Sequence, residues 1–268
     1  MNIIGDYHVH TPFCPHGSND KWENYINKAI EAGLKEISFT EHAPLPRNFI
    51  DPVPEQDSSM SYSNLDQYFK VGQQLKVAYK NEIKVNIGFE VDYIEGYEKE
   101  ITEFLNDYGE MIDDAILSVH MLKHNDEYFC LDFSDEEFGR LVKRFGSIEA
   151  VYRAYYQTVK LAVKSDLGQY KPTRIGHLSL VEKFKKTYPT SFNDHDLIDE
   201  ILLLIKQKGY TLDLNTAGLY KPLCQSIYPN TQIVKKAIQL GIRLIPGSDS
   251  HESSTIARGF GNIKHFFI

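Results

Sequence analysis

The chain has 268 residues, of which 42% are hydrophobic and 25% charged, a composition typical of a globular protein with a sizeable core. No apolar run is long enough to span a membrane, and the first ten residues lack the basic start and apolar centre of a signal peptide. The formal net charge of −8 argues against general nucleic-acid binding, which requires a basic surface.

The strand-like apolar runs of the chain alternate with amphipathic helical stretches. The runs cover residues 2–9, 36–42, 83–91, 114–122, 173–180, 210–215 and 242–249, and clear helical stretches cover 19–33, 147–165 and 193–209. This alternation predicts an α/β fold with a mostly parallel sheet. Seven strands without a linker favour a closed or nearly closed TIM-like barrel, so we expect one domain over residues 1–268. An open doubly wound sheet would instead place a glycine-rich phosphate loop after the first strand.

Two other segments have a distinctive composition. Residues 42–61 carry four prolines and a serine cluster, which predicts a long ordered loop of the kind that often binds a ligand or covers a site. The basic stretch KFKK at 183–186 is interpreted as a solvated helix face.

Metal-ligand side chains gather at or just after the predicted strand ends. They are His8, His10, His16, His42, Glu90, His120, His177, Asp249 and His251. The carboxyl ends of parallel barrel strands meet at one face, so these side chains should converge there. Imidazole and carboxylate ligands suit zinc, manganese and iron, and nine candidates exceed the needs of one ion. We therefore expect a cluster of two or three ions, bridged by Glu90.

Each of these residues has a structural alternative when taken alone. A single histidine can be a satisfied core residue, Glu90 can form a salt bridge, and Asp249 can belong to a turn. Their joint position at one barrel face favours the metal interpretation. Cys14 lies among the candidate ligands and could be a soft metal contact, but we interpret it as an incidental small residue.

The three cysteines of the chain indicate its redox environment. Cys14, Cys130 and Cys224 are an odd number and contain no CxxC pair. This usage argues against a disulfide framework and suggests a reducing compartment. We expect a cytoplasmic protein.

Six sequence motifs follow one another along the chain: HVHTPFCPHG, FTEHAP, GFEVDY, LSVHML, IGHLSL and PGSDSH. Together they resemble the motifs of the polymerase-and-histidinol-phosphatase (PHP) superfamily. The form of the first motif and the segment 212–230 are similar to the stand-alone histidinol-phosphate phosphatases of that superfamily.

The resemblance implies a distorted (β/α)7 barrel that holds a trinuclear centre of divalent Zn, Mn or Fe. The implied ligand sets are His8, His10, Glu90 and Asp249 for the first ion, Glu90, His120 and His177 for the second, and His16, His42 and His251 for the third. It also implies hydrolysis of L-histidinol phosphate by a metal-bridging hydroxide.

We expect Asp249 to handle the proton of the attacking water. Lys221, Arg258 and Asn215 are candidate substrate contacts, because a phosphate ester needs cationic partners beyond the metals. Arg174 could join them or form a structural ion pair. The expected partner is a small phosphomonoester, and neither nucleic acid nor a membrane is expected.

Two other functions remain open at this point. A relative with the same ligands could cleave a nucleotide or another phosphoester, although a single-strand exonuclease should show basic residues leading into the site. A non-catalytic metal-binding or regulatory domain should have lost a ligand such as Glu90 or Asp249, and both are present.

Overall fold

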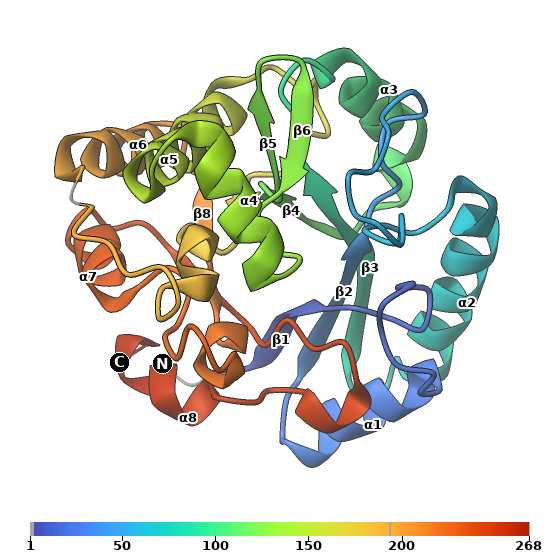
Figure 1. The fold of residues 1–268 in the computed structure, drawn as a ribbon. Coiled ribbons are helices and arrows are strands. Elements are labelled where there is room, and N and C mark those ends of the chain that lie inside the picture. Colours follow the sequence, from blue (N-terminus) through green and yellow to red (C-terminus); the bar gives the residue numbers. More distant parts are fainter. Residues whose placement is uncertain (1–2, 193, 268) are drawn as a thin grey trace.

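The computed structural model describes residues 3–192 and 194–267, and at its centre is a seven-stranded parallel sheet that curls into a nearly closed barrel (Figure 1). In spatial order the strands are β1 (Gly5–Val9), β2 (Glu36–His42), β3 (Lys84–Asp92), β4 (Asp114–Ser118), β7 (Arg174–Ile175), β8 (Thr211–Asn215) and β9 (Leu244–Gly247). Spatial order follows chain order, as in a singly wound barrel. The predicted α/β, TIM-like architecture is confirmed.

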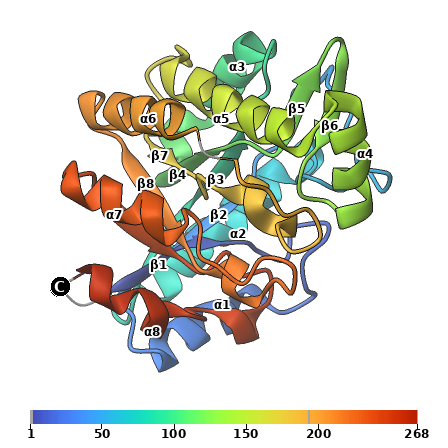
Figure 2. The same ribbon diagram turned by 60° about the vertical axis from the view of Figure 1, so that its left-hand side comes forward.

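The helices lie around the outside of the strands (Figures 1 and 2). They are α1 (Trp22–Glu31), α2 (Leu65–Ala78), α3 (Glu98–Tyr108), α4 (Asp135–Phe145), α5 (Ile148–Lys164), α6 (His195–Gln207), α7 (Thr231–Gln239) and α8 (Phe260–Ile263). Because they cover the sheet, its strands are buried on both faces: every residue of β3 after Lys84 is buried.

The barrel closes at a seam between its first and last strands. One parallel bridge joins Val9 to Ser250. Two backbone hydrogen bonds extend it, from the amide of His10 to the carbonyl of Ser250 (2.9 Å) and from the amide of Asp249 to the carbonyl of His8 (2.7 Å). The seam therefore brings candidate ligands from the two ends of the chain into direct contact.

The predicted strand 114–122 is divided in the structure. β4 ends at Ser118, and β5 (Met121–His124) pairs with β6 (Glu127–Cys130) in a separate antiparallel hairpin. Figure 1 shows this hairpin above the barrel beside α4. The sequence analysis missed it, because His120 lies between two apolar runs that read as one.

The predicted strand 173–180 is also shorter than expected. Only Arg174 and Ile175 pair with both neighbouring strands. The backbone amide of His177 points to the Asp213 carboxylate (3.5 Å), so the chain leaves the sheet at this position. Of the expected segments, residues 2 and 193 lie outside the described part of the chain.

Hydroxyl caps set the start of the two helices that follow the hairpin. The hydroxyl of Ser134 accepts from the amide of Glu137 at the start of α4, and Ser147 accepts from Ala150 at the start of α5 (both 3.1 Å). Between them, Gly146 ends α4 with a φ of 87°, a conformation that glycine adopts without penalty.

The proline-rich loop is ordered by its own side chains. The carboxylate of Asp51 accepts hydrogen bonds from the amides of Val53 and Ser58 (both 3.0 Å) and from the Ser58 hydroxyl (2.9 Å). The amide of Met60 bonds to the carbonyl of His42 (3.3 Å), which ties the end of the loop to β2. No helix in the described part of the chain is long and apolar enough to cross a membrane.

Candidate metal centre

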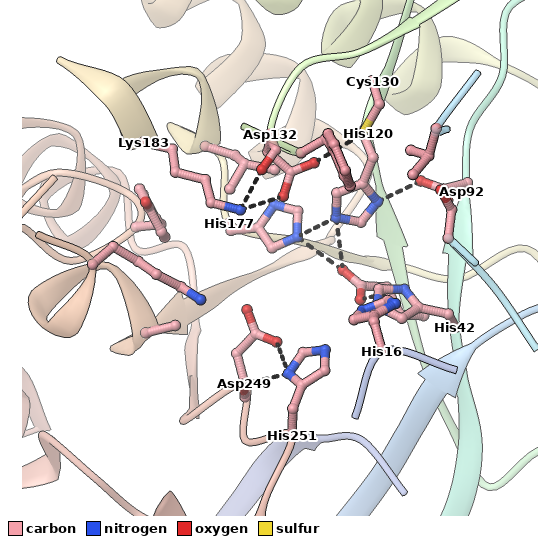
Figure 3. Close-up of a pocket in the computed structure, with 18 of the residues that line it drawn as sticks. His16, His42, Asp92, His120, Cys130, Asp132, His177, Lys183, Asp249 and His251 are labelled. Carbon is pink, nitrogen blue, oxygen red and sulfur yellow. Dashed lines mark hydrogen bonds and ion pairs between the residues drawn. The ribbon is translucent and has the colours of Figure 1, made fainter. Parts of the chain in front are cut away.

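The nine predicted ligands lie together at the carboxyl ends of the barrel strands, and Figure 3 shows several of them around one cavity. They lie together because the carboxyl ends of all the parallel barrel strands are at the same face of the barrel. The ligand atoms of eight of the nine fall into three neighbouring groups, one of which also contains Cys14.

The first group joins the two sides of the barrel seam. One ligand atom each from His8, His10 and Asp249 lies within 4.8 Å of the others. Oδ1 of Asp249 is 3.2 Å from Nε2 of His10 and 3.7 Å from Nε2 of His8. Oε2 of Glu90 lies 3.3 Å from His8 Nε2 and 3.5 Å from His10 Nε2, so this carboxylate reaches the same group.

The second group uses the other oxygen of Glu90. Oε1 is 2.8 Å from Nε2 of His177 and 3.7 Å from Nε2 of His120. The two imidazole nitrogens face each other at 3.1 Å (Figure 3). The two Glu90 oxygens therefore point to different groups. That Glu90 bridges two ions stays a prediction.

The third group differs from the expected set. Ligand atoms of His10, Cys14, His42 and His251 all lie within 4.8 Å of one another. His16 lies beside this group, with its ring centroid 5.2 Å from that of His42 and 5.1 Å from that of His251. The sequence analysis placed Cys14 among the candidate ligands, but interpreted it as an incidental small residue and not as a soft metal contact.

His16 is connected to the proline-rich loop. Its Nδ1 lies 2.8 Å from the backbone carbonyl of Asp57, and this contact requires the proton to be on Nδ1. Nε2 is then left free to bind an ion.

Buried carboxylates hold three of the histidines from behind. Each lies near the Nδ1 atom, and this arrangement directs Nε2 toward the centre of the site. The pairs are Asp213 with His8 (2.9 Å), Glu41 with His10 (3.3 Å) and Asp92 with His120 (2.6 Å). Sequence reasoning missed Glu41 and Asp213. Both are acidic residues within strands that are mostly buried, and this pattern could have indicated a buried polar contact.

The donor atoms are suited to cations. Nε2 of His8, Nε2 of His10 and Nδ1 of His42 are buried and have no hydrogen-bond partner among the described residues. Carboxylate oxygens nevertheless lie close to these nitrogens, with Asp249 3.2 Å from His10 and Glu90 3.3 Å from His8 and from His42. A cation bound between such nitrogen and oxygen atoms would satisfy both. The residues therefore fit a multinuclear metal centre.

The three groups open onto one cavity of about 460 Å³. Three cationic side chains line it: Lys183, Lys221 and Arg258. Nζ of Lys183 lies 2.9 Å from Oδ2 of Asp132, a carboxylate at the end of the hairpin (Figure 3). Lys183 belongs to the stretch interpreted as a solvated helix face, and that interpretation was wrong for this residue.

Lys221 and Arg258 lie at the edge of the cavity. Partial burial and the nearby charge of Lys183 lower the pKa of Lys221. The guanidinium of Arg258 stacks on the ring of Tyr220 at 4.3 Å. Both cationic side chains line the cavity.

Asn215 and Arg174 lie deeper than the cavity wall. The amide nitrogen of Asn215, which is fully buried, donates to Oδ2 of Asp249 (3.1 Å). Asn215 therefore contacts a candidate ligand directly. Arg174 is paired with Asp114 (2.9 Å), as the structural alternative predicted.

Comparisons with known proteins agree with this architecture. A family model described as PHP domain matches residues 6–217. The histidinol-phosphatase of Bacillus subtilis is 43% identical over 95% of this chain and 96% of its own. A crystal structure of the protein assigned as a histidinol phosphatase in Listeria monocytogenes is 40% identical, with a TM-score of 0.93 over 96% of this chain and 99% of that one.

A more distant structure has the same fold. It is the histidinol phosphate phosphatase of Lactococcus lactis complexed with zinc, L-histidinol and phosphate, at 24% identity and a TM-score of 0.72 over 98% of this chain and 94% of that one. The family match covers well over half of the chain, and the Bacillus relative is similar almost from end to end. The chain therefore belongs to the PHP-domain family, in its histidinol-phosphatase branch.

Proposed function

We propose that this protein is a histidinol-phosphatase, which hydrolyses L-histidinol phosphate to L-histidinol and phosphate. The observation that carries the proposal is that all three groups of candidate metal ligands have members lining one cavity, and that Lys183 and Lys221 line the same cavity. Such a site can hold a phosphoryl group between metal ions and lysine side chains. The similarity to the Bacillus histidinol-phosphatase along almost the whole chain supports the substrate.

The nine ligands would hold three divalent ions of zinc, manganese or iron. The sets are His8, His10, Glu90 and Asp249, then Glu90, His120 and His177, then His16, His42 and His251. Ions in these positions would make water a nucleophile at neutral pH and polarise the phosphoryl oxygens. The nitrogen and oxygen donors suit all three metals.

The two lysines and Arg258 line the cavity and would bind oxygens of the phosphate. Charged donors form strong hydrogen bonds to phosphate oxygens. Lys183 is held in place by Asp132, so its ammonium group is already oriented at the cavity wall. Lys221 has no ion-pair partner among the described residues within 4.0 Å, and its charge is available to the substrate.

Asp249 is the group that we expect to accept the proton of the attacking water. Its side chain is 19% exposed and lines the cavity. Its backbone has a φ of 55°, which is uncommon for a residue other than glycine. The amide of Asn215 fixes Oδ2 of the carboxylate at 3.1 Å, so Asn215 acts as a positioning residue.

The proline-rich loop would contact the histidinol end of the substrate. Val53, Asp57 and Ser58 line the cavity. The Asp57 carboxylate has no hydrogen-bond partner among the described residues, and it can pair with the ammonium group of histidinol. A loop contact of this kind would distinguish histidinol phosphate from other monoesters.

Hydrolysis of three esters tests the proposal, measured as phosphate release for the two monoesters and as p-nitrophenol release for the diester. The metal-free protein is reloaded separately with zinc, manganese or iron and is given L-histidinol phosphate, p-nitrophenyl phosphate or bis(p-nitrophenyl) phosphate. We expect a large preference in kcat/KM for histidinol phosphate. Equal or faster cleavage of the diester would contradict histidinol phosphate as the substrate. If the metal-loaded protein hydrolysed none of the esters, the proposed catalytic role would be wrong.

A further inference from the structure

The sulfur of Cys14 lies among the metal ligands. The side chain is 4% exposed, and its Sγ is within 4.8 Å of ligand atoms of His10, His42 and His251. This is the largest of the three close groups found in the described residues, and it is the one that contains sulfur.

The local backbone holds Cys14 in this position. The amide of Cys14 bonds to the carbonyl of Thr11 (3.0 Å), and the amide of Gly17 bonds to the carbonyl of Cys14 (3.1 Å). Both the amide (2.8 Å) and the hydroxyl (2.5 Å) of Thr11 donate to Glu41, the same carboxylate that contacts His10. The cysteine and the histidine are therefore positioned from one common anchor.

Glycine at position 17 permits this packing. A Cβ there would lie 3.1 Å from Cβ of Cys14 and 3.3 Å from its carbonyl oxygen. Any larger residue at position 17 would press against Cys14, so glycine allows the cysteine to keep its position in the turn.

A second, independent observation indicates a ligand at this place. His42 is more than nine-tenths buried, and its Nδ1 makes no hydrogen bond to a described residue, although Oε2 of Glu90 lies 3.3 Å away. A buried nitrogen without a hydrogen bond is costly. An ion bound by His42 and by the nearby sulfur would satisfy both side chains.

We propose that Cys14 binds, through its sulfur, the ion held by His42 and His251. The inference rests on the metal centre of the proposed function. It adds a soft ligand to a centre whose other donors are nitrogen and oxygen. Sulfur ligands favour zinc over manganese, so Cys14 would give this position a metal preference that the histidines and carboxylates alone do not supply.

The chain provides two matched controls. Cys130 also lines the cavity, but its sulfur lies 3.4 Å from a carboxylate oxygen of Asp132. Cys224 is buried beside Ser226, with 3.3 Å between Sγ and the serine hydroxyl. Neither sulfur belongs to a close ligand group among the described residues.

Cobalt substitution tests the proposal through a readout other than activity. The metal-free full-length protein is titrated with Co²⁺ to constant metal content, and the sulfur-to-cobalt charge-transfer band in the near ultraviolet is recorded. We expect the band in the wild type, in Cys130→Ser and in Cys224→Ser, and its loss in Cys14→Ser and Cys14→Ala. X-ray absorption of the zinc-loaded wild type should show a sulfur neighbour at about 2.3 Å, and Cys14→Ser should lack it.

Two results would overturn the inference. One is a wild type with full cobalt content and no charge-transfer band, and the other is a band that persists in Cys14→Ser. Phosphate release from histidinol phosphate is measured on the same samples. A charge-transfer band without hydrolysis would contradict the proposed function but support Cys14 as a metal ligand. Hydrolysis without a band would support the proposed function but contradict Cys14 as a metal ligand.

Discussion

The carboxylate of Asp213 lies 2.9 Å from Nδ1 of His8, and both side chains are fully buried. This contact holds the ring so that Nε2 points to Glu90 and Asp249 on the other side. Two residues separated by 205 positions in the sequence thus determine how one ligand faces the centre.

Asp213→Asn should weaken metal binding while leaving the ligands themselves intact. An amide is a weaker partner for the imidazole, and loss of such a contact typically lowers metal affinity about 10- to 100-fold. Competition with a chromogenic chelator measures the affinity for zinc. Unchanged zinc affinity together with a lower melting temperature of the metal-free protein would show that Asp213 is only a core residue.

Lys221→Met should lower kcat/KM for histidinol phosphate by roughly 10- to 100-fold, since a hydrogen bond to a charged group contributes about 1.5–3 kcal/mol. Inhibition by inorganic phosphate should weaken in parallel. Lys185→Met is the matched control, because Lys185 pairs with Glu182 (3.2 Å) and is not among the residues that line the cavity. Equal losses in the two variants would contradict a specific phosphate contact.

Removal of the metals should destabilise the protein as well as inactivate it. Ligand atoms without partners, such as Nε2 of His8 and of His10, are buried at the barrel seam. Ions that bind only the folded state stabilise it by mass action. We expect chelation to lower the melting temperature and zinc to restore it; a melting temperature that does not depend on metal would argue against a centre at the seam.

Asp51→Ala should weaken substrate binding by the proline-rich loop more than it weakens metal binding. The substitution removes three hydrogen bonds, to Val53 and Ser58, that close the loop. We expect KM for histidinol phosphate to rise severalfold, with metal content unchanged and turnover of p-nitrophenyl phosphate affected less. A parallel change for both esters would mean that the loop does not contact the histidinol group.

Lys171→Met should destabilise the fold without affecting catalysis. Nζ of Lys171 donates to the carbonyls of Ala162 (2.8 Å), Val163 (3.1 Å) and Ser165 (2.6 Å) at the end of α5. Loss of these bonds should lower the free energy of unfolding by about 1–3 kcal/mol, measured by urea denaturation. Lys160→Met, on the same helix and paired at the surface with Glu200, should cost less than about 1 kcal/mol.

The sequence predicted those parts of the site that follow from strand order. His42, Glu90 and Asp249 converge because each lies at or near the carboxyl end of a barrel strand, and strand ends could be read from the apolar runs. The closeness of the Cys14 sulfur to His10, His42 and His251, and the contact of Lys183 with Asp132, could not be read in this way. Both depend on contacts made by irregular segments. Cys14 lies in a tight turn, and Lys183 pairs with Asp132, which follows the β5–β6 hairpin.

The seam between β1 and β9 has a consequence for how the protein is made. His8 and His10 are synthesised early, but Asp249 and His251, which complete their groups, follow more than two hundred residues later. A growing chain therefore carries only part of the group at this seam for most of its synthesis, whereas the group of Glu90, His120 and His177 is complete by residue 177. If the group at the seam holds an ion, that ion can be fully bound only when the barrel closes, and it would then join the oldest and newest parts of the chain.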